Sequence, residues 1–130
     1  MKAALSVFLS CMGLVVSTGA VLAHHSFDAE YDRNKTVVMK GIVTRLEWMN
    51  PHTRFYIDVK DANGRVTNWN LELGSPNVLI RAGWTRHSLN VGDLVTVTAY
   101  LARDGSRMAN ARTIILANGK EVFGGSSAGS

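Results

Sequence analysis

Hydrophobic and polar residues alternate in several short runs of the chain, which is the pattern of half-buried β-strands. The clearest run is 54–60, where every second residue is apolar (Phe55, Ile57 and Val59). A β-rich stretch from Thr36 to Trp48 precedes it and has Gly41 near its middle, where a long strand can bend or bulge. The pattern therefore predicts two consecutive strands with one face in the core.

Turn signals separate these strands from the next one. Asn50-Pro51-His52-Thr53 predicts a β-turn, because Asn is favoured at the first position and Pro at the second. Asp61-Ala62-Asn63-Gly64 predicts a hairpin that leads into a return strand. In that strand alternation places Trp69, Leu71 and Leu73 inward and Asn68, Asn70 and Glu72 outward.

The alternation then gives way to helix signals. Ser75 is a good N-cap, Pro76 suits the first helical position, and residues 77–82 predict a short helix that ends at Gly83. Leu79, Ile80 and Trp84 are expected to cover one open end of a barrel. Two further strands are predicted, Leu94 to Ala102 and Met108 to Leu116, joined by a turn at Asp104-Gly105-Ser106.

Three strands, a short helix and two strands is the order of the OB-fold. We therefore predict an all-β domain with one short helix, a five-stranded OB-like Greek-key barrel of topology β-β-β-α-β-β, over residues 24–123. A small β-sandwich is the alternative. The Gly/Ser-rich tail 124–130 is predicted to be disordered.

The first 23 residues have the order of a signal peptide: Lys2, an apolar run from Ala3 to Val16, and Val21-Leu22-Ala23 before the cut. Cleavage after Ala20 is an alternative that leaves an apolar stub. A membrane anchor is disfavoured, because a run of about 14 residues is shorter than the roughly 20 that span a bilayer. We expect a periplasmic or secreted protein with no membrane span after cleavage.

Cys11 is the one cysteine of the 130 residues. A lipid-acceptor role for it is a minor alternative, because the apolar run continues past it. Its removal with the signal peptide would exclude disulfides, thiolate metal sites and cysteine nucleophiles from the mature chain. Removal of Lys2 lowers the formal charge from +4 to +3, and the remaining basic residues are scattered among acids. This charge pattern favours neither nucleic acid nor anionic lipid as a partner.

Four segments carry a family resemblance: His24-His25-Ser26-Phe27, the stretch 47–52 around Asn50-Pro51-His52, the stretch 69–77, and Gly83-Trp84. Together they resemble an uncharacterised family of small secreted bacterial proteins, a domain of unknown function. The likeness extends from His24 to about Phe123 and supports export and a single domain. It brings no activity with it, so function has to be argued from site chemistry.

The predicted mature N-terminus is the first candidate site. Cleavage after Ala23 makes His24 the first residue, which can chelate a metal through its α-amine and its ring. A third nitrogen from His52 on the rim turn would complete a site suited to Cu(II), which favours nitrogen ligands in tetragonal geometry. His25 is a further donor and His87 a weaker one. Alternatively, the histidine pair is a solvated arm and His52 only stabilises its turn.

Trp48 and Met49 are loosely similar to the rim of small periplasmic copper carriers, which are also OB barrels. The resemblance implies copper as the bound metal. However, Pro51 and Thr53 stand where the carriers' scheme needs thioethers, which puts Cu(I) binding by that scheme in doubt.

A second hypothesis is a binding module for an envelope ligand such as an oligosaccharide or peptide, on the sheet face used by OB folds. Its candidate residues are Trp48, Arg54 and Tyr56, and Tyr56 is the evident stacking platform. A third hypothesis is an envelope protein partner, with Trp69 and Trp84 serving the core. Nucleic acid is disfavoured because the face lacks paired aromatics and a basic stripe.

No catalytic constellation is evident. Neither Ser26 nor Ser75 lies in a nucleophile elbow, and the carboxylates Asp58, Glu72 and Asp93 show no acid/base spacing. We therefore predict that the protein is not an enzyme.

Overall fold

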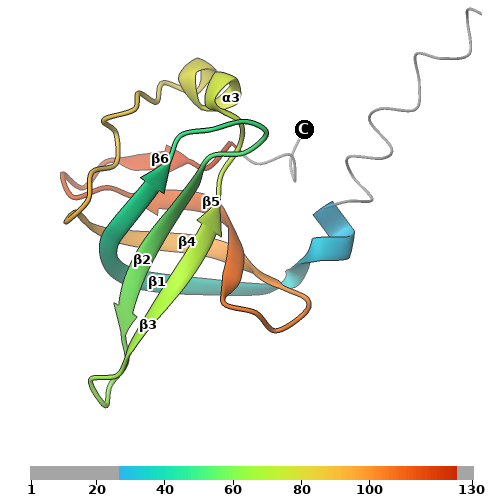
Figure 1. The fold of residues 1–130 in the computed structure, drawn as a ribbon, viewed down its shortest axis with the longest axis vertical. Helices are drawn as coiled ribbons and strands as arrows, with labels where there is room; N and C mark the ends of the chain where they lie inside the picture. Colours follow the sequence, from blue (N-terminus) through green and yellow to red (C-terminus); the bar gives the residue numbers. More distant parts are fainter. Residues whose placement is uncertain (1–26, 126–130) are drawn as a thin grey trace, which may run out of the picture.

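The computed structural model describes residues 27–125 (Figure 1). A helical turn at 27–30 leads into the first strand. The described elements are β1 (Tyr31–Glu47), β2 (Arg54–Lys60), β3 (Val66–Glu72), α3 (Pro76–Arg81), β4 (Leu94–Ala102), β5 (Met108–Ile115) and β6 (Glu121–Phe123). The predicted signal peptide, with His24 and His25, lies outside the described residues.

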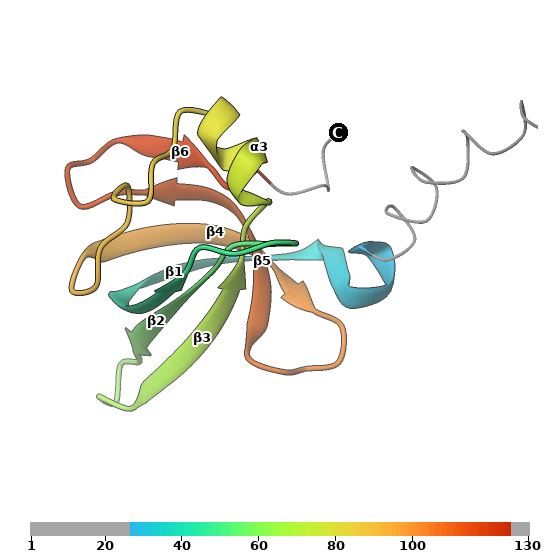
Figure 2. The same cartoon turned by 45° about the horizontal axis from the view of Figure 1, so that its top comes forward.

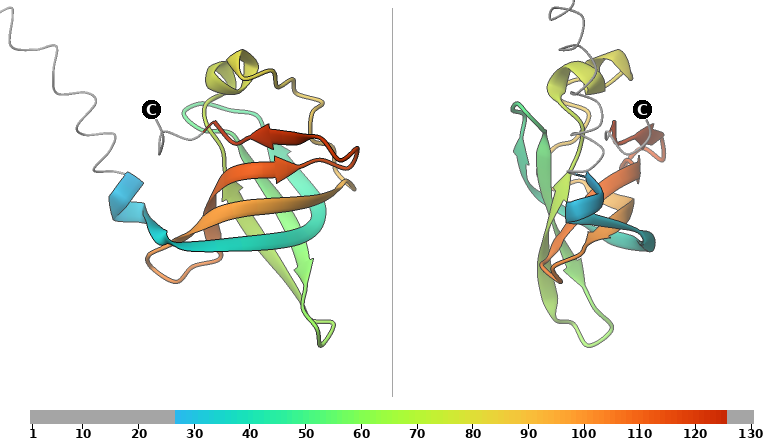
Figure 3. Two further views of the ribbon diagram at one scale, coloured as in Figure 1. Left: turned by 180° about the vertical axis from the view of Figure 1, so that it is seen from behind. Right: turned by 90° about the vertical axis from the view of Figure 1, so that its right-hand side faces the viewer.

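The strands form one sheet in the order β3-β2-β1-β4-β5-β6, and an additional parallel pairing of β3 with β5 closes it into a ring. This confirms the predicted all-β fold with one short helix and a five-stranded OB-like barrel. Figure 3 shows that the barrel is flattened into two layers, with β2 and β3 on one side and β4, β5 and β6 on the other. The short strand β6 was not predicted.

Strand β1 belongs to both layers. It pairs with β4 from Thr36 to Ile42 and with β2 from Gly41 to Glu47. At Gly41 an added Cβ would lie 2.5 Å from the backbone oxygen of Asp58, so only glycine allows the two strands to approach there. The predicted role of Gly41 in a long, bent strand fits this crossing point, and a register shift follows between Val43 and Arg45.

Apolar side chains on the inner faces of both layers form the core, and alternation predicted this for Phe55, Ile57, Leu71 and Leu73, all fully buried. Leu79 and Trp84 also join the core, as expected for a cover on one end of the barrel. Ile80 does not, because its side chain is 55% exposed. The six-residue helix presents one narrow apolar stripe, which Leu79 occupies.

The chain end completes the cover over this end of the barrel. Ser75 caps α3 by accepting a hydrogen bond from the Val78 N–H, as predicted. The Trp84 indole donates to the backbone oxygen of Phe123 at 2.9 Å, and Gly74 N–H donates to Gly124 at 2.8 Å. Gly124 and Gly125, the first residues of the predicted tail, are thus buried against the barrel.

We predict that Gly74→Ala destabilises the protein by about 2–4 kcal/mol, because the new Cβ would overlap the backbone oxygen of Gly125. Gly105→Ala is the matched control. Gly105 has φ +76° but open space around it, so we expect a loss of only about 1 kcal/mol. Urea unfolding followed by tryptophan fluorescence measures both, and equal losses would contradict the packing of the chain end on Gly74.

Candidate functional site

A buried carboxylate lies at the end of β3. Glu72 was predicted to face solvent, and its register with Arg54 and Asn110 does put it on the outer side of the barrel. Its residue surface is nevertheless only 5% exposed, because the chain around Tyr31 packs over this part of the sheet. The prediction of a wet position was therefore wrong.

Four side chains from separate elements contact the Glu72 carboxylate. The Tyr31 hydroxyl donates to Oε2 at 2.9 Å, and Arg54 Nη2 donates to the same oxygen at 2.7 Å. Asn110 Nδ2 donates to Oε1 at 3.5 Å, and His52 Nδ1 lies 3.3 Å from Oε1. Glu72 therefore links β1, the β1–β2 loop, β2 and β5 at the seam where the barrel closes.

The phenol of Tyr31 remains protonated at this seam. Burial raises the pKa of Tyr31 well above its ordinary value, and the negative charge of Glu72 raises it further. Arg54 provides the positive charge that compensates the buried carboxylate. Within the described part of the chain, the Oδ1 atom of Asn110 has no hydrogen-bond partner, although Asn110 is buried.

His52 is the most exposed of the four side chains, at 40% against 24% for Arg54. It follows the cis Asn50–Pro51 peptide on the loop between β1 and β2, on the predicted rim turn. When the imidazole is neutral, a proton on Nδ1 that is donated to Glu72 leaves Nε2 with a free lone pair. This is the arrangement in which a carboxylate orients a histidine for metal binding.

The start of the described chain is anchored beside the same group. The Phe27 ring packs on Tyr31 with 5.4 Å between ring centroids and on Tyr100 at 6.2 Å. The Arg103 N–H donates to the backbone oxygen of Glu30 at 2.9 Å. Figure 2 shows the resulting helical turn at the side of the barrel, at the start of β1. His24 and His25, which precede it, are outside the described residues.

The alternative sheet-face residues are paired with their neighbours. Arg54 donates to Asn70 as well as to Glu72, and the guanidinium of Arg45 lies 4.4 Å from the centroid of the Tyr56 ring. Trp48 is half-buried against the core cluster. The structure thus places Arg54 and Tyr56 on one outer face, with their polar atoms already hydrogen-bonded.

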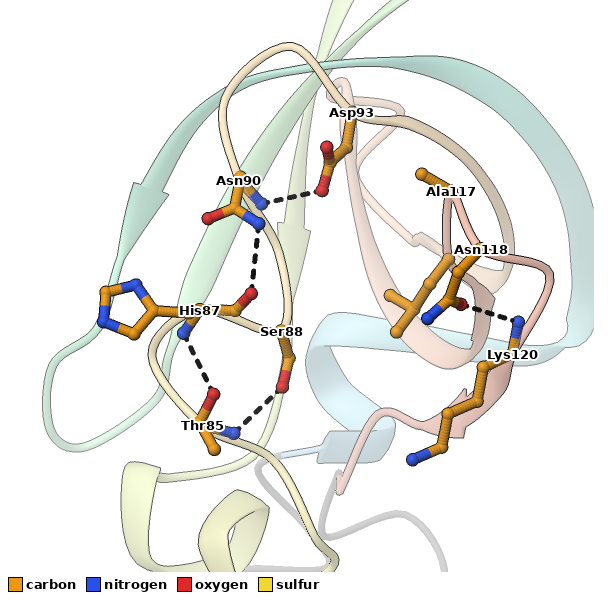
Figure 4. Close-up of a pocket in the computed structure, with 9 residues that line it drawn as sticks. Thr85, His87, Ser88, Asn90, Asp93, Ala117, Asn118 and Lys120 are labelled. Atoms are coloured by element: carbon orange, nitrogen blue, oxygen red, sulfur yellow. Dashed lines mark hydrogen bonds between the residues drawn. The ribbon is translucent and has the colours of Figure 1, made fainter.

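His87 lines a different hollow, of about 430 Å³, between the loop after α3 and the β5–β6 turn. Figure 4 shows its imidazole pointing away from Asn118 and Lys120 on the opposite side. The polar groups there bond locally; for example, Asn90 Nδ2 donates to the His87 backbone oxygen at 3.0 Å. His87 is not among the residues that contact Glu72.

Within residues 27–125, no group of three or more His, Cys, Asp or Glu side chains lies close enough together to hold a metal ion. His52 is therefore not part of a metal-binding cluster within the described residues. The same residues contain no helix long and apolar enough to cross a membrane.

Sequence reasoning found His52 and Arg54 but missed the roles of Glu72, Tyr31 and Asn110. Alternation along β3 gives the face on which Glu72 lies, but it does not tell which segment covers that face. The available signals were a tyrosine in the stretch before the first predicted strand and an asparagine inside the last predicted strand. Neither specifies its partner.

The fold and this rim define the class of protein: a small OB-like barrel with a partly exposed histidine beside a buried carboxylate. The chain belongs to the family of unknown function DUF6152, whose profile matches residues 12–111. Among solved structures, it is similar to the mitochondrial single-stranded DNA binding protein Rim1 of S. cerevisiae, at 14% identity and a TM-score of 0.50. That match covers 63% of this chain and 92% of the other and shows the fold alone. No curated protein matches the sequence.

We predict that Tyr31→Phe destabilises the protein by about 1–3 kcal/mol at pH 7, because the buried carboxylate loses one donor. Because the pKa of Tyr31 is raised in the folded protein, the folded protein keeps the phenol proton above pH 10.0, the ordinary pKa at which the unfolded chain releases it. Stability from Tyr31 is therefore complete below that pH and falls above it, by about 1.4 kcal/mol per pH unit.

Urea unfolding at a series of pH values from about 7 to about 11.5, which spans that ionisation, measures this dependence. Tyr31→Phe should flatten the alkaline loss. Tyr56→Phe is the control, because its hydroxyl contacts Glu47 on a more exposed face at 3.3 Å. An unchanged alkaline slope in Tyr31→Phe would contradict the assigned role.

Proposed function

We propose that the protein is an exported, non-catalytic binding protein that holds a metal ion, best suited to Cu(II), at one barrel rim. His52 supplies a ring nitrogen, and His24 and His25 at the processed N-terminus supply the rest. The observation that carries the proposal is the pair of His52 Nδ1 and Glu72 Oε1, 3.3 Å apart, on an imidazole that remains 40% exposed. Glu72 would fix the ring so that Nε2 faces the metal.

The anchored N-terminal segment supports the same arrangement. Phe27 packs on Tyr31, and Tyr31 bonds to the carboxylate that contacts His52. His24 precedes Phe27 by three residues, which span at most about 10 Å when extended. An α-amine, a His24 ring and a His52 ring would give three nitrogen donors, a set that Cu(II) favours.

The sheet-face hypothesis has less support. An OB face that binds sugars, peptides or single-stranded nucleic acid needs free stacking rings and free donors. Here the Tyr56 ring carries Arg45 on one side, and Arg54 is engaged by Glu72 and Asn70. We therefore propose neither an oligosaccharide nor a nucleic acid as the ligand, although the structural neighbour Rim1 is a single-stranded DNA binding protein.

The test is a Cu(II) titration of the chain that begins at His24. Residues 27–125 contain the whole barrel and its core, so this chain retains every contact described above. We expect stoichiometric binding, weakened at least about tenfold by one extra residue before His24 or by His52→Ala. Glu72→Gln should weaken it about 10- to 100-fold as an orienting residue. Circular dichroism checks that each variant is folded.

His87→Ala is the matched control, because His87 lies in the other hollow and should leave Cu(II) affinity unchanged. Equal affinity in the parent, the extended chain and His52→Ala would overturn the proposal. If His87→Ala weakens Cu(II) binding and His52→Ala does not, the metal lies elsewhere and the proposal is overturned as well.

A further inference from the structure

Within residues 27–125, no helix or strand lies over the outer face of the layer formed by β1, β4, β5 and β6 (Figure 3, left). Large apolar side chains on it are exposed by 41 to 69%: Val38, Ile42, Leu94, Ile115 and Phe123. Threonines of β4 and β5 lie between them. The segment 27–31 packs on Tyr100 and Ala102, at the far end of β4, and leaves these positions uncovered. Exposed apolar residues gathered on one face indicate an interaction surface.

Strand register arranges this face in rows. One row contains Lys40, Thr96, Ile115 and Glu121, each opposite the next across neighbouring strands. The adjacent row contains Val38, Thr98, Thr113 and Phe123 in the same strand order. The first row thus has a positive charge at its β1 end and a negative charge at its β6 end.

Lys40 and Glu121 are exposed, and neither has an ion-pair partner within residues 27–125. The face therefore has a positive side chain at its β1 edge and a negative one at its β6 edge, where the Arg112 guanidinium also lies 5.4 Å from the centroid of the Phe123 ring. The middle of the row, between these charges, is Thr96 and Ile115.

A second copy fits this pattern. Consider a two-fold axis that lies in the contact plane, parallel to the strands and between β4 and β5. A half turn about it reverses every row, so Lys40 of each copy meets Glu121 of the other, and Val38 meets Phe123. In a two-fold interface each residue pair occurs twice, as the Lys40–Glu121 and Val38–Phe123 pairs do here. Face-to-face packing of two sheets with nearly aligned strands is also a common geometry.

We propose that this outer face is a self-association surface and that its occupant is a second copy of this chain. Four strands about 4.8 Å apart and a few residues tall give less area than the roughly 800 Å² per partner of a standard interface. We therefore expect a weak dimer and set the concentration range for a dissociation constant on the order of 100 µM. None of the row residues contacts Glu72, so the His52 rim is not part of this face.

Sedimentation equilibrium of the metal-free chain from His24, at about 10 µM to 1 mM and low salt, tests the proposal. We expect concentration-dependent dimers in the parent. Lys40→Glu and Glu121→Lys should each weaken association at least about tenfold, because each creates like-charge contacts. The double variant Lys40→Glu/Glu121→Lys should return to within about threefold of the parent, because it restores both pairs.

Lys60→Glu is the control for net charge, since Lys60 is exposed at the end of β2, outside the rows. It should leave association unchanged. A parent that stays monomeric throughout would overturn the proposal, and so would a double variant as weak as the single ones. If none of the four variants changes the dissociation constant of the dimer, the contact lies on another surface and the proposal is equally overturned. Because no metal is present, these outcomes are independent of the copper titration.

Discussion

Burying a carboxylate is costly unless positive charge and hydrogen-bond donors surround it, and Glu72 imposes this requirement on the whole barrel. Its residue surface is 5% exposed, and its partners come from β1, β2, β5 and the β1–β2 loop. Glu72 also pairs in register with Asn110, where β3 and β5 close the ring. One carboxylate thus contacts side chains at the closure of the barrel, at the start of β1 and on the rim loop.

The outer surface near Glu72 differs in chemistry from the outer face of the β1, β4, β5 and β6 layer. Around Glu72, polar side chains are used to satisfy one another, as Arg54 does with Asn70 and Tyr56 does with Glu47. Among the four side chains that contact Glu72, the His52 ring is the most exposed, so the proposed metal site is placed at that rim. The rows of threonine and apolar side chains on the outer face of β1, β4, β5 and β6 lie apart from this network and suit contact with another sheet.

Alternation and turn signals predicted the order of elements because inward positions such as Phe55, Ile57 and Leu71 follow the two-residue period of strands. Strand β6 was missed, since three residues are too few to show a period. The burial of Glu72 was missed for a different reason. Periodicity assigns a residue to a face, whereas the segment that covers the face comes from far away in sequence, as Tyr31 does here.

The same distinction applies to the candidate site. His52 was predictable because a histidine on a rim turn is visible in the sequence, but the sequence does not show that Glu72, 20 positions later, lies 3.3 Å from its Nδ1. Phe27 is placed by aromatic contacts with Tyr31 at the start of β1 and with Tyr100 near the end of β4. No local pattern specifies such contacts, so the link between the N-terminus and the rim emerges only in three dimensions.

The central claim is that Glu72 holds the His52 ring in one orientation with Nε2 free. A ¹⁵N–¹H correlation spectrum of the histidine rings, recorded above the ordinary histidine pKa and without metal, tests this most directly. The account predicts that His52 is protonated on Nδ1 in the parent and that Glu72→Gln changes this to a mixture of tautomers. A parent ring protonated on Nε2, or one that does not respond to Glu72→Gln, would contradict it.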